Sequence, residues 1–108
     1  MEVGNKKQAE IIVYGDVMLD EYLWGDVRRV SPEAPVPVVN LEDREYRLGG
    51  AANVALNIRR AGVSVSIFGC VGNDSAGKRL KMLTNEHGIT CNFLHGAVQT
   101  TTKTRIMA

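Results

Sequence analysis

Long apolar runs, cysteine and a strong excess of one charge are all scarce in this sequence. No apolar stretch approaches the roughly 20 residues that a bilayer-spanning helix needs, and the first ten residues are polar rather than a hydrophobic signal segment. We therefore expect a soluble, cytoplasmic protein with no membrane partner. The 13 basic and 12 acidic side chains leave a formal net charge of +1, without the basic stripe typical of nucleic-acid binding. We expect no nucleic-acid partner either.

The chain has only two cysteines and three prolines, and their positions are informative. Cys70 and Cys91 lie in apolar segments without His or Cys neighbours at metal-ligand spacing. This context favours buried, reduced thiols over a disulfide or a metal site. All three prolines fall within residues 31–37, which predicts an ordered loop leading into an edge strand.

Short β-branched or apolar runs predict the strands. The run at 11–14 predicts a buried strand that ends in a loop at Gly15-Asp16. Residues 36–48 are extended in pattern but rich in charge, which predicts a strand on a solvated flap rather than in the main sheet. Further strands are expected at 63–68, 89–94 and 101–107, the last two joined by a turn around Gly96.

Two segments have the three- or four-residue spacing of amphipathic helices. The first follows Gly49-Gly50, covers 52–61 and stops at Gly62. The second is capped by Asn73-Asp74 and stops at Gly88. Its inward stripe is expected to consist of Ala76, Leu80, Leu83 and His87. Strands that alternate with helices predict an α/β fold with a largely parallel sheet and an extra β layer.

Candidate ligand groups lie where the strands of a parallel sheet end and helices begin. The Asp16 carboxylate, after the first strand, can accept hydrogen bonds from two sugar hydroxyls; the alternative is that it satisfies backbone donors in a turn. Gly49 and Gly50 would let a ligand approach the backbone, and Asn53 adds a donor and an acceptor. The alternative is a tight strand-to-helix corner. Neither GxGxxG nor GxxxxGK[ST] occurs, which disfavours a dinucleotide-binding domain or a phosphate loop.

Four charged residues are weaker candidates. Asp20 and Glu21 could add carboxylates to the same cleft, or they could be surface charges in a loop. Lys103 and Arg105 alternate along a predicted strand and would share one face. There they could pair with a sugar phosphate, Arg through a bidentate fork and Lys as a point charge, unless that face is simply solvated. The sequence does not decide whether Tyr22 covers the loop or lines it.

Three segments together resemble the ribokinase and phosphofructokinase-B superfamily of sugar kinases, from about residue 11 to the end. They are Gly15-Asp16-Val17-Met18-Leu19-Asp20 with Tyr22 and Gly25, Ser31-Pro32-Glu33-Ala34-Pro35-Val36-Pro37-Val38, and Gly49-Gly50-Ala51-Ala52-Asn53-Val54-Ala55. The glycine motif is typical of the superfamily. The proline-containing segment is similar to the heptose-7-phosphate kinases that form the amino-terminal half of a bifunctional kinase and adenylyltransferase.

The resemblance implies the amino-terminal part of a ribokinase-like three-layer α/β/α domain with a small β lid. Residues 11–108 would form this part, after a polar extension at 1–10. Residues 36–48 and 100–108 would supply lid strands, and lids of related kinases pair into homodimers. By motif position, Asp16 resembles the family's sugar-hydroxyl ligand. Gly49, Gly50 and Asn53 resemble its sugar-site glycine signature.

The activity implied is phosphorylation of a sugar phosphate with ATP and Mg²⁺. For the heptose branch, the acceptor is the anomeric hydroxyl of D-glycero-D-manno-heptose 7-phosphate, and the 1,7-bisphosphate is a lipopolysaccharide core precursor. Family members carry their catalytic Asp and anion hole in a Gly-Ala-Gly-Asp-type segment, which does not occur here. Phosphoryl transfer depends on such positioning and charge stabilisation.

We therefore expect this chain, which halts in mid-strand at 104–108, to supply the sugar site of a longer parent and to be inactive alone. The ATP site and the catalytic Asp would lie beyond residue 108. The alternative is a non-catalytic sugar-binding or assembly module built from the lid and partial sheet. Unpaired strand edges would favour its association with a partner.

Overall fold

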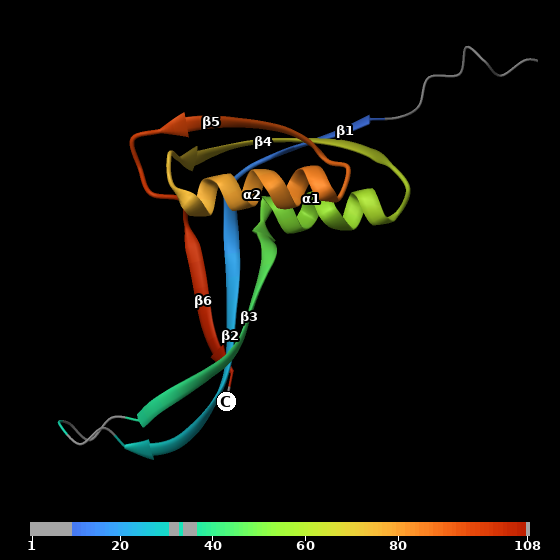
Figure 1. Cartoon of the computed structure of the whole chain (residues 1–108). Coiled ribbons are helices and arrows are strands. Elements are labelled where there is room, and N and C mark those ends of the chain that lie inside the picture. The colour runs from blue at the N-terminus through green and yellow to red at the C-terminus, as the bar shows by residue number, and fades with distance from the viewer. Residues whose placement is uncertain (1–9, 31–32, 34–36, 108) are drawn as a thin grey trace, which may run out of the picture.

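The computed structural model describes residues 10–30, 33 and 37–107, which form two three-stranded sheets and two helices (Figure 1). In chain order the elements are β1 (Glu10–Tyr14), β2 (Val17–Val30), β3 (Pro37–Gly50), α1 (Ala51–Arg60), β4 (Ser64–Gly72), α2 (Ser75–Glu86), β5 (Thr90–Gly96) and β6 (Thr102–Met107). The expected extension at 1–10 lies outside the described residues except for Glu10, and so does most of the expected loop at 31–37. Neither described helix is long and apolar enough to cross a membrane.

The first sheet, with the helices packed on it, forms the body of the molecule. Its strands are all parallel in the order β1-β4-β5, and α1 and α2 lie on the same face (Figure 1). Alternate residues such as Val65 and Ile67 point to the helices and are 1% and 0% exposed. The predicted α/β class with a parallel sheet is confirmed. Among the described residues no helix covers the opposite face, so the body has two layers, the sheet and the helices.

The core lies where the helices meet the sheet and the root of the second sheet. Its buried apolar members are Val17, Leu19, Leu48, Ala52, Ala55, Leu56, Val65, Ile67, Val71, Leu80 and Ile89. Three sequence expectations about burial were wrong. The run at 11–14 was expected to be a buried strand, but β1 is an edge strand on which Ile12 and Tyr14 are 62% and 87% exposed, because the helices cover only one face of the sheet. His87 is exposed at the carboxyl-terminal cap of α2, because the buried positions of the helix are Gly77, Leu80 and Thr84. Cys70 is also exposed, since it lies on the uncovered face of the sheet.

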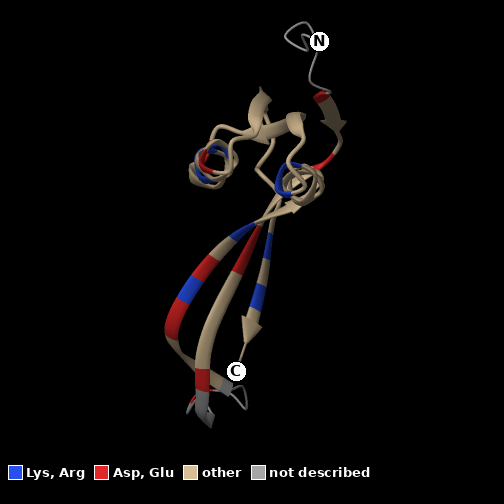
Figure 2. Cartoon of the chain, turned by 90° about the vertical axis from the view of Figure 1, so that its right-hand side faces the viewer, with Lys and Arg blue, Asp and Glu red and all other residues tan. Residues whose placement is uncertain are grey.

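The second sheet, in the order β3-β2-β6, extends away from the body as a lid (Figure 1). β2 runs antiparallel to β3 and parallel to β6. Acidic and basic positions are interspersed along these strands (Figure 2), as expected for a solvated flap. The lid strands expected near 36–48 and 100–108 are confirmed. The third lid strand, β2, was missed, because residues 17–30 mix apolar and charged side chains without a clear alternation.

Candidate functional site

The lid joins the body at Gly50, where β3 ends and α1 begins. Gly50 has φ 57° and ψ −134°, a backbone conformation that residues with a Cβ rarely adopt. The Ala51 amide donates a hydrogen bond to the Asp16 carbonyl at 2.8 Å. A Cβ on Gly50 would overlap that same carbonyl. The corner itself therefore requires glycine at this position, whether or not a ligand also approaches the backbone.

The preceding glycine makes room for a carboxylate. A Cβ on Gly49 would lie 2.6 Å from Asp20 Oδ1 and 2.8 Å from Met18 Cγ. Asp20 is on strand β2, opposite Arg47 and not in a loop as its surface-charge interpretation supposed. Its Oδ1 atom is buried and accepts no hydrogen bond from the described residues. A buried oxygen without a donor is costly, so a donor from a ligand would stabilise this arrangement.

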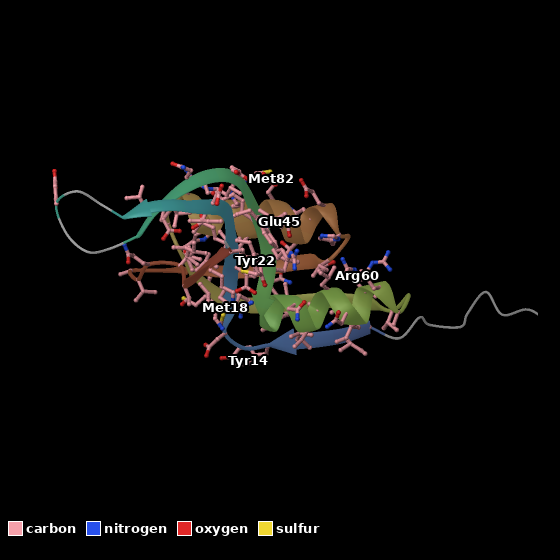
Figure 3. The ribbon with its side chains drawn as sticks, turned by 90° about the horizontal axis from the view of Figure 1, so that it is seen from below. Tyr14, Met18, Tyr22, Glu45, Arg60 and Met82 are labelled. Carbon is pink, nitrogen blue, oxygen red and sulfur yellow. The ribbon has the colours of Figure 1, made fainter. Side chains whose placement is uncertain are left out.

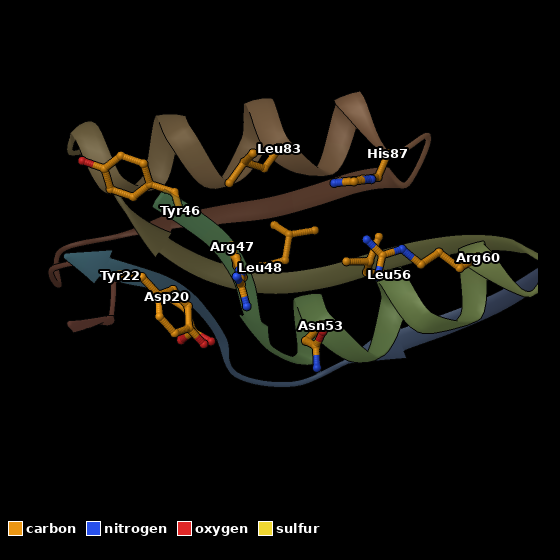
Figure 4. Close-up of a pocket in the computed structure, with 10 residues that line it drawn as sticks. All are labelled: Asp20, Tyr22, Tyr46, Arg47, Leu48, Asn53, Leu56, Arg60, Leu83 and His87. Atoms are coloured by element: carbon orange, nitrogen blue, oxygen red, sulfur yellow. The ribbon is translucent and has the colours of Figure 1, made fainter. Parts of the chain in front are cut away.

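Asp20 shares a cavity of about 460 Å³ with Asn53, the polar residue of the glycine motif (Figure 4). The cavity lies beside the edge strand β3, between the lid and the two helices. Its other lining residues are Tyr22, Tyr46, Arg47, Leu48, Leu56, Arg60, Leu83 and His87. The structure thus brings two sequence candidates from separate motifs into one cavity.

Asp16 is nearby but faces a different hollow. It lines a space of about 200 Å³ with apolar neighbours such as Tyr14, Phe68 and Leu94, at the carboxyl ends of the parallel strands. The Asp16 side chain is exposed, and its backbone carbonyl holds the first residue of α1. Asp16 and Asn53 therefore lie on either side of the Gly50 corner rather than in one cavity.

The register of the lid gathers charged groups on one face. Asp20 lies opposite Arg47 of β3 and Lys103 of β6, and in the next row Tyr22 lies opposite Arg105. Directly paired residues share a face of a sheet. The expectation that Lys103 and Arg105 share one face is met, and that face is the one that carries Asp20.

Tyr22 organises two guanidinium groups on this face. Arg105 Nη1 donates to the Tyr22 hydroxyl at 2.8 Å, and the Arg47 guanidinium lies 4.5 Å from the centroid of the Tyr22 ring. Arg47 also donates a hydrogen bond from its Nε to the Glu45 carboxylate, and this bond, together with the negative charge of Glu45, raises the pKa of the Arg47 guanidinium. Figure 3 shows Tyr22 and Glu45 on neighbouring lid strands.

Sequence reasoning missed Arg47 as a candidate. The available signal was its spacing, because a strand residue two positions before Gly49 projects from the same face as Gly49. That signal becomes useful only when residues 37–50 are known to be one continuous strand.

The described residues do not fit a nucleotide and magnesium site. Over 10–30, 33 and 37–107, no group of three or more His, Cys, Asp or Glu side chains is arranged to hold a metal ion. The Gly49-Gly50 corner lacks the lysine and hydroxyl residues of a phosphate loop. What the cavity offers is hydroxyl recognition by Asp20 and Asn53 next to a cationic lid face.

Similar proteins are found over nearly the whole chain. The chain is 50% identical over 103 residues to the bifunctional protein HldE of Haemophilus influenzae, and 48% identical over 93 residues to that of Coxiella burnetii. These matches cover 94% and 86% of this chain but only 22% and 20% of the relatives. The chain therefore spans about a fifth of the length of these proteins.

Solved structures with a similar fold include a carbohydrate kinase from Agrobacterium tumefaciens, with a TM-score of 0.72 and 22% identity over 90% of this chain and 31% of that one. Phosphofructokinase-2 from Escherichia coli in complex with fructose-6-phosphate gives 0.68 and 17%, over 92% of this chain and 31% of that one. The same enzyme in its tetrameric inhibited form also matches at 0.68 and 17%, over 92% and 31%. These likenesses confirm a partial ribokinase-like fold.

Residues 8–108 match the family described as pfkB family carbohydrate kinase, which agrees with the resemblance carried by the three motif segments. The chain belongs to the pfkB family of carbohydrate kinases.

Proposed function

We propose that the protein containing this chain is a cytoplasmic carbohydrate kinase. It transfers a phosphoryl group from ATP, with Mg²⁺, to the anomeric hydroxyl of D-glycero-D-manno-heptose 7-phosphate, and the 1,7-bisphosphate formed is a lipopolysaccharide core precursor. The observation that carries the proposal is the unpaired, buried Oδ1 of Asp20, packed against Gly49 in the cavity that Asn53 lines. The near 50% identity to the bifunctional protein HldE supports the heptose branch.

The sugar binds at the junction of lid and body. The Asp20 carboxylate accepts a hydrogen bond from a sugar hydroxyl, which pairs its buried oxygen, and Asn53 donates to or accepts from a second hydroxyl. The missing side chain of Gly49 leaves room for the Asp20 carboxylate itself. A sugar that extends past the Gly50 corner also meets the exposed Asp16 carboxylate, which lines the neighbouring hollow.

The substrate phosphate lies against the lid. Lys103 and Arg105 provide two positive charges on the face that carries Asp20, and Arg105 is oriented by its hydrogen bond to Tyr22. A planar guanidinium binds phosphate oxygens in pairs, which orients the sugar as well as attracting it. Arg47 adds a third positive charge nearby.

This chain supplies the sugar half of the active site and is inactive alone. It is the amino-terminal part, residues 11–108, of a larger kinase domain that carries the ATP and Mg²⁺ sites and the catalytic Asp. Two lids pair into a homodimer; the open edges of β3 and β6 support such pairing.

A second candidate function is a non-catalytic sugar-binding or assembly module. The observation that favours it is the uncovered sheet face, on which Tyr14 and Leu94 are 87% and 76% exposed. Such apolar exposure is typical of a surface that another protein segment covers.

Calorimetric titration of the 108-residue chain with heptose 7-phosphate, beside an ATP-consumption assay on the same sample, tests the proposal. We expect binding without turnover. Asp20→Asn should weaken binding about tenfold or more, because it removes a charged hydrogen-bond acceptor. Asp43→Asn is the matched control, since Asp43 is an exposed lid carboxylate outside the cavity. Equal affinity of the two variants, or turnover by the chain alone, would contradict the proposal.

A further inference from the structure

A buried threonine marks the point where the chain leaves the body for the lid strand β6. Thr100 is 7% exposed, and its hydroxyl donates to Asp74 Oδ1 at 2.6 Å while its amide donates to Asp74 Oδ2 at 2.9 Å. The Thr100 hydroxyl also accepts a hydrogen bond from the Gly72 amide at 2.9 Å. Thr100 is therefore held by three hydrogen bonds, two through its hydroxyl and one through its amide, and both carboxylate oxygens of Asp74 are used.

Two glycines shape the socket that Thr100 occupies. A Cβ on Gly72 would overlap the Val98 carbonyl and lie 3.0 Å from the Thr100 nitrogen, and a Cβ on Gly77 would lie 3.0 Å from the Thr100 hydroxyl oxygen. These glycines flank Asp74 in sequence, at the end of β4 and the start of α2. The two glycines therefore leave room for Thr100 beside Asp74.

Strand β6 has few other attachments. Among the described strands it pairs with β2 alone, at the edge of the lid, and its residues Thr102–Met107 are all exposed. Just before β6 begins, the Leu19 amide of β2 donates a hydrogen bond to the Thr101 carbonyl at 2.9 Å. Figure 1 shows β6 descending from the body beside the start of α2. Pairing with β2 holds β6 along its length, and the Thr100–Asp74 hydrogen bonds tie its start to the body.

We propose that Asp74 and Thr100 are positioning residues that fix β6, and with it Lys103 and Arg105, on the sugar-binding face. The inference rests on the proposed function for its consequence in substrate binding. Asp74 touches none of the residues assigned to the sugar; it acts through Thr100 and the strand that follows. Loss of the contact lets β6 move relative to β2, so that Arg105 no longer stays beside Tyr22.

Asp74 also caps α2, because its Oδ1 accepts a hydrogen bond from the Gly77 amide at 2.8 Å. An Asp74 variant would therefore disturb the helix as well as the strand. Thr100→Val avoids this problem, since it removes the hydroxyl while the capping bond and the side-chain shape remain. Thr100→Ser restores the hydroxyl. Thr84→Val is the matched control, because Thr84 is fully buried and its hydroxyl donates to the Lys81 carbonyl inside α2.

Amide hydrogen exchange on the whole chain, followed residue by residue, provides the test. In Thr100→Val we expect the protection of Lys103–Ile106 to fall about tenfold or more, with the protection of β4 unchanged. Thr100→Ser should retain most of the protection, and Thr84→Val should leave β6 as in the original chain. Unchanged β6 protection in Thr100→Val, or an equal loss in β4 and β6, would overturn the proposal.

Titration of the same variants with heptose 7-phosphate separates this inference from the proposed function. If the original chain binds, Thr100→Val should weaken the binding of heptose 7-phosphate more than the binding of the unphosphorylated heptose. An equal loss of affinity for both sugars would overturn the link to Lys103 and Arg105. If the original chain binds neither sugar, the proposed half-site fails, whereas exchange in β6 still decides whether Thr100 fixes the strand.

Discussion

In the body, two helices bury one face of a parallel sheet, and side chains such as Ile67 and Leu80 are completely inaccessible. In the lid, by contrast, three strands carry charges on both faces, and β6 has no buried residue. Apolar burial stabilises the first region, whereas backbone hydrogen bonds and contacts with the body hold the second. The charged and polar side chains available for recognition therefore lie where apolar packing is weakest, on the lid and at its junction with the body.

The strongest test of this comparison removes equivalent side chains from the two regions. Leu80→Ala, at a 0% exposed position of α2, should lower the free energy of unfolding by about 2–5 kcal/mol, because it leaves a cavity in the core. Leu41→Ala, at a 50% exposed position of β3, should change it by less than about 0.5 kcal/mol. Urea unfolding followed by circular dichroism measures both, and similar losses would show that the lid is as well packed as the body.

A glycine pair tests the junction between the regions. Gly50 and Gly62 both have positive φ, 57° and 88°, but a Cβ on Gly62 would meet nothing within 4 Å. Gly62→Ala should therefore cost only backbone strain, about 1 kcal/mol. Gly50→Ala should cost more, about 2–3 kcal/mol, because the Asp16 carbonyl must also move. Equal losses in thermal unfolding would mean that the corner adapts freely.

Acid should weaken the Asp74 contact between the regions. The Thr100 hydroxyl, assisted by the amides of Thr100 and Gly77, lowers the pKa of the Asp74 carboxyl. Its stabilising effect is therefore complete above the unfolded pKa of about 4, and it is lost as pH falls through the lower folded value. The difference in unfolding free energy between the original chain and Asp74→Asn should shrink steadily below about pH 4. A difference that stays constant down to pH 2 would exclude this linkage.

Much of the body could be predicted from local pattern. The spacing of Ala52, Ala55 and Leu56 predicted α1, and Asp74 predicted the start of α2, because capping and amphipathic periodicity act over a few residues. His87 was assigned to the buried stripe wrongly, since the last turn of a helix can leave the face that its first turns define. β2 was missed because its mixed pattern becomes a strand only through pairing with β3 and β6.

The candidate site divides in the same way. Asp16 and the glycine motif were visible in the sequence, but the placement of Asp16 and Asn53 in two separate hollows was not. Asp20 changed from a surface charge to the central candidate because its burial depends on Gly49, far along the chain. Arg47 became a candidate because the strand register places it opposite Asp20. Thr100 became one because its hydroxyl donates a hydrogen bond to Asp74.

The sequence alone determined the family, the α/β order of the body and the residue types at the glycine corner, because these depend on short motifs and local periodicity. Only the tertiary structure decided which charges share the lid face, which carboxylate oxygen is buried without a partner, and what attaches β6 to the body. These features depend on contacts between residues far apart in the chain, such as Gly49 with Asp20 and Thr100 with Asp74. Such contacts arise from strand register and packing, which no local pattern specifies.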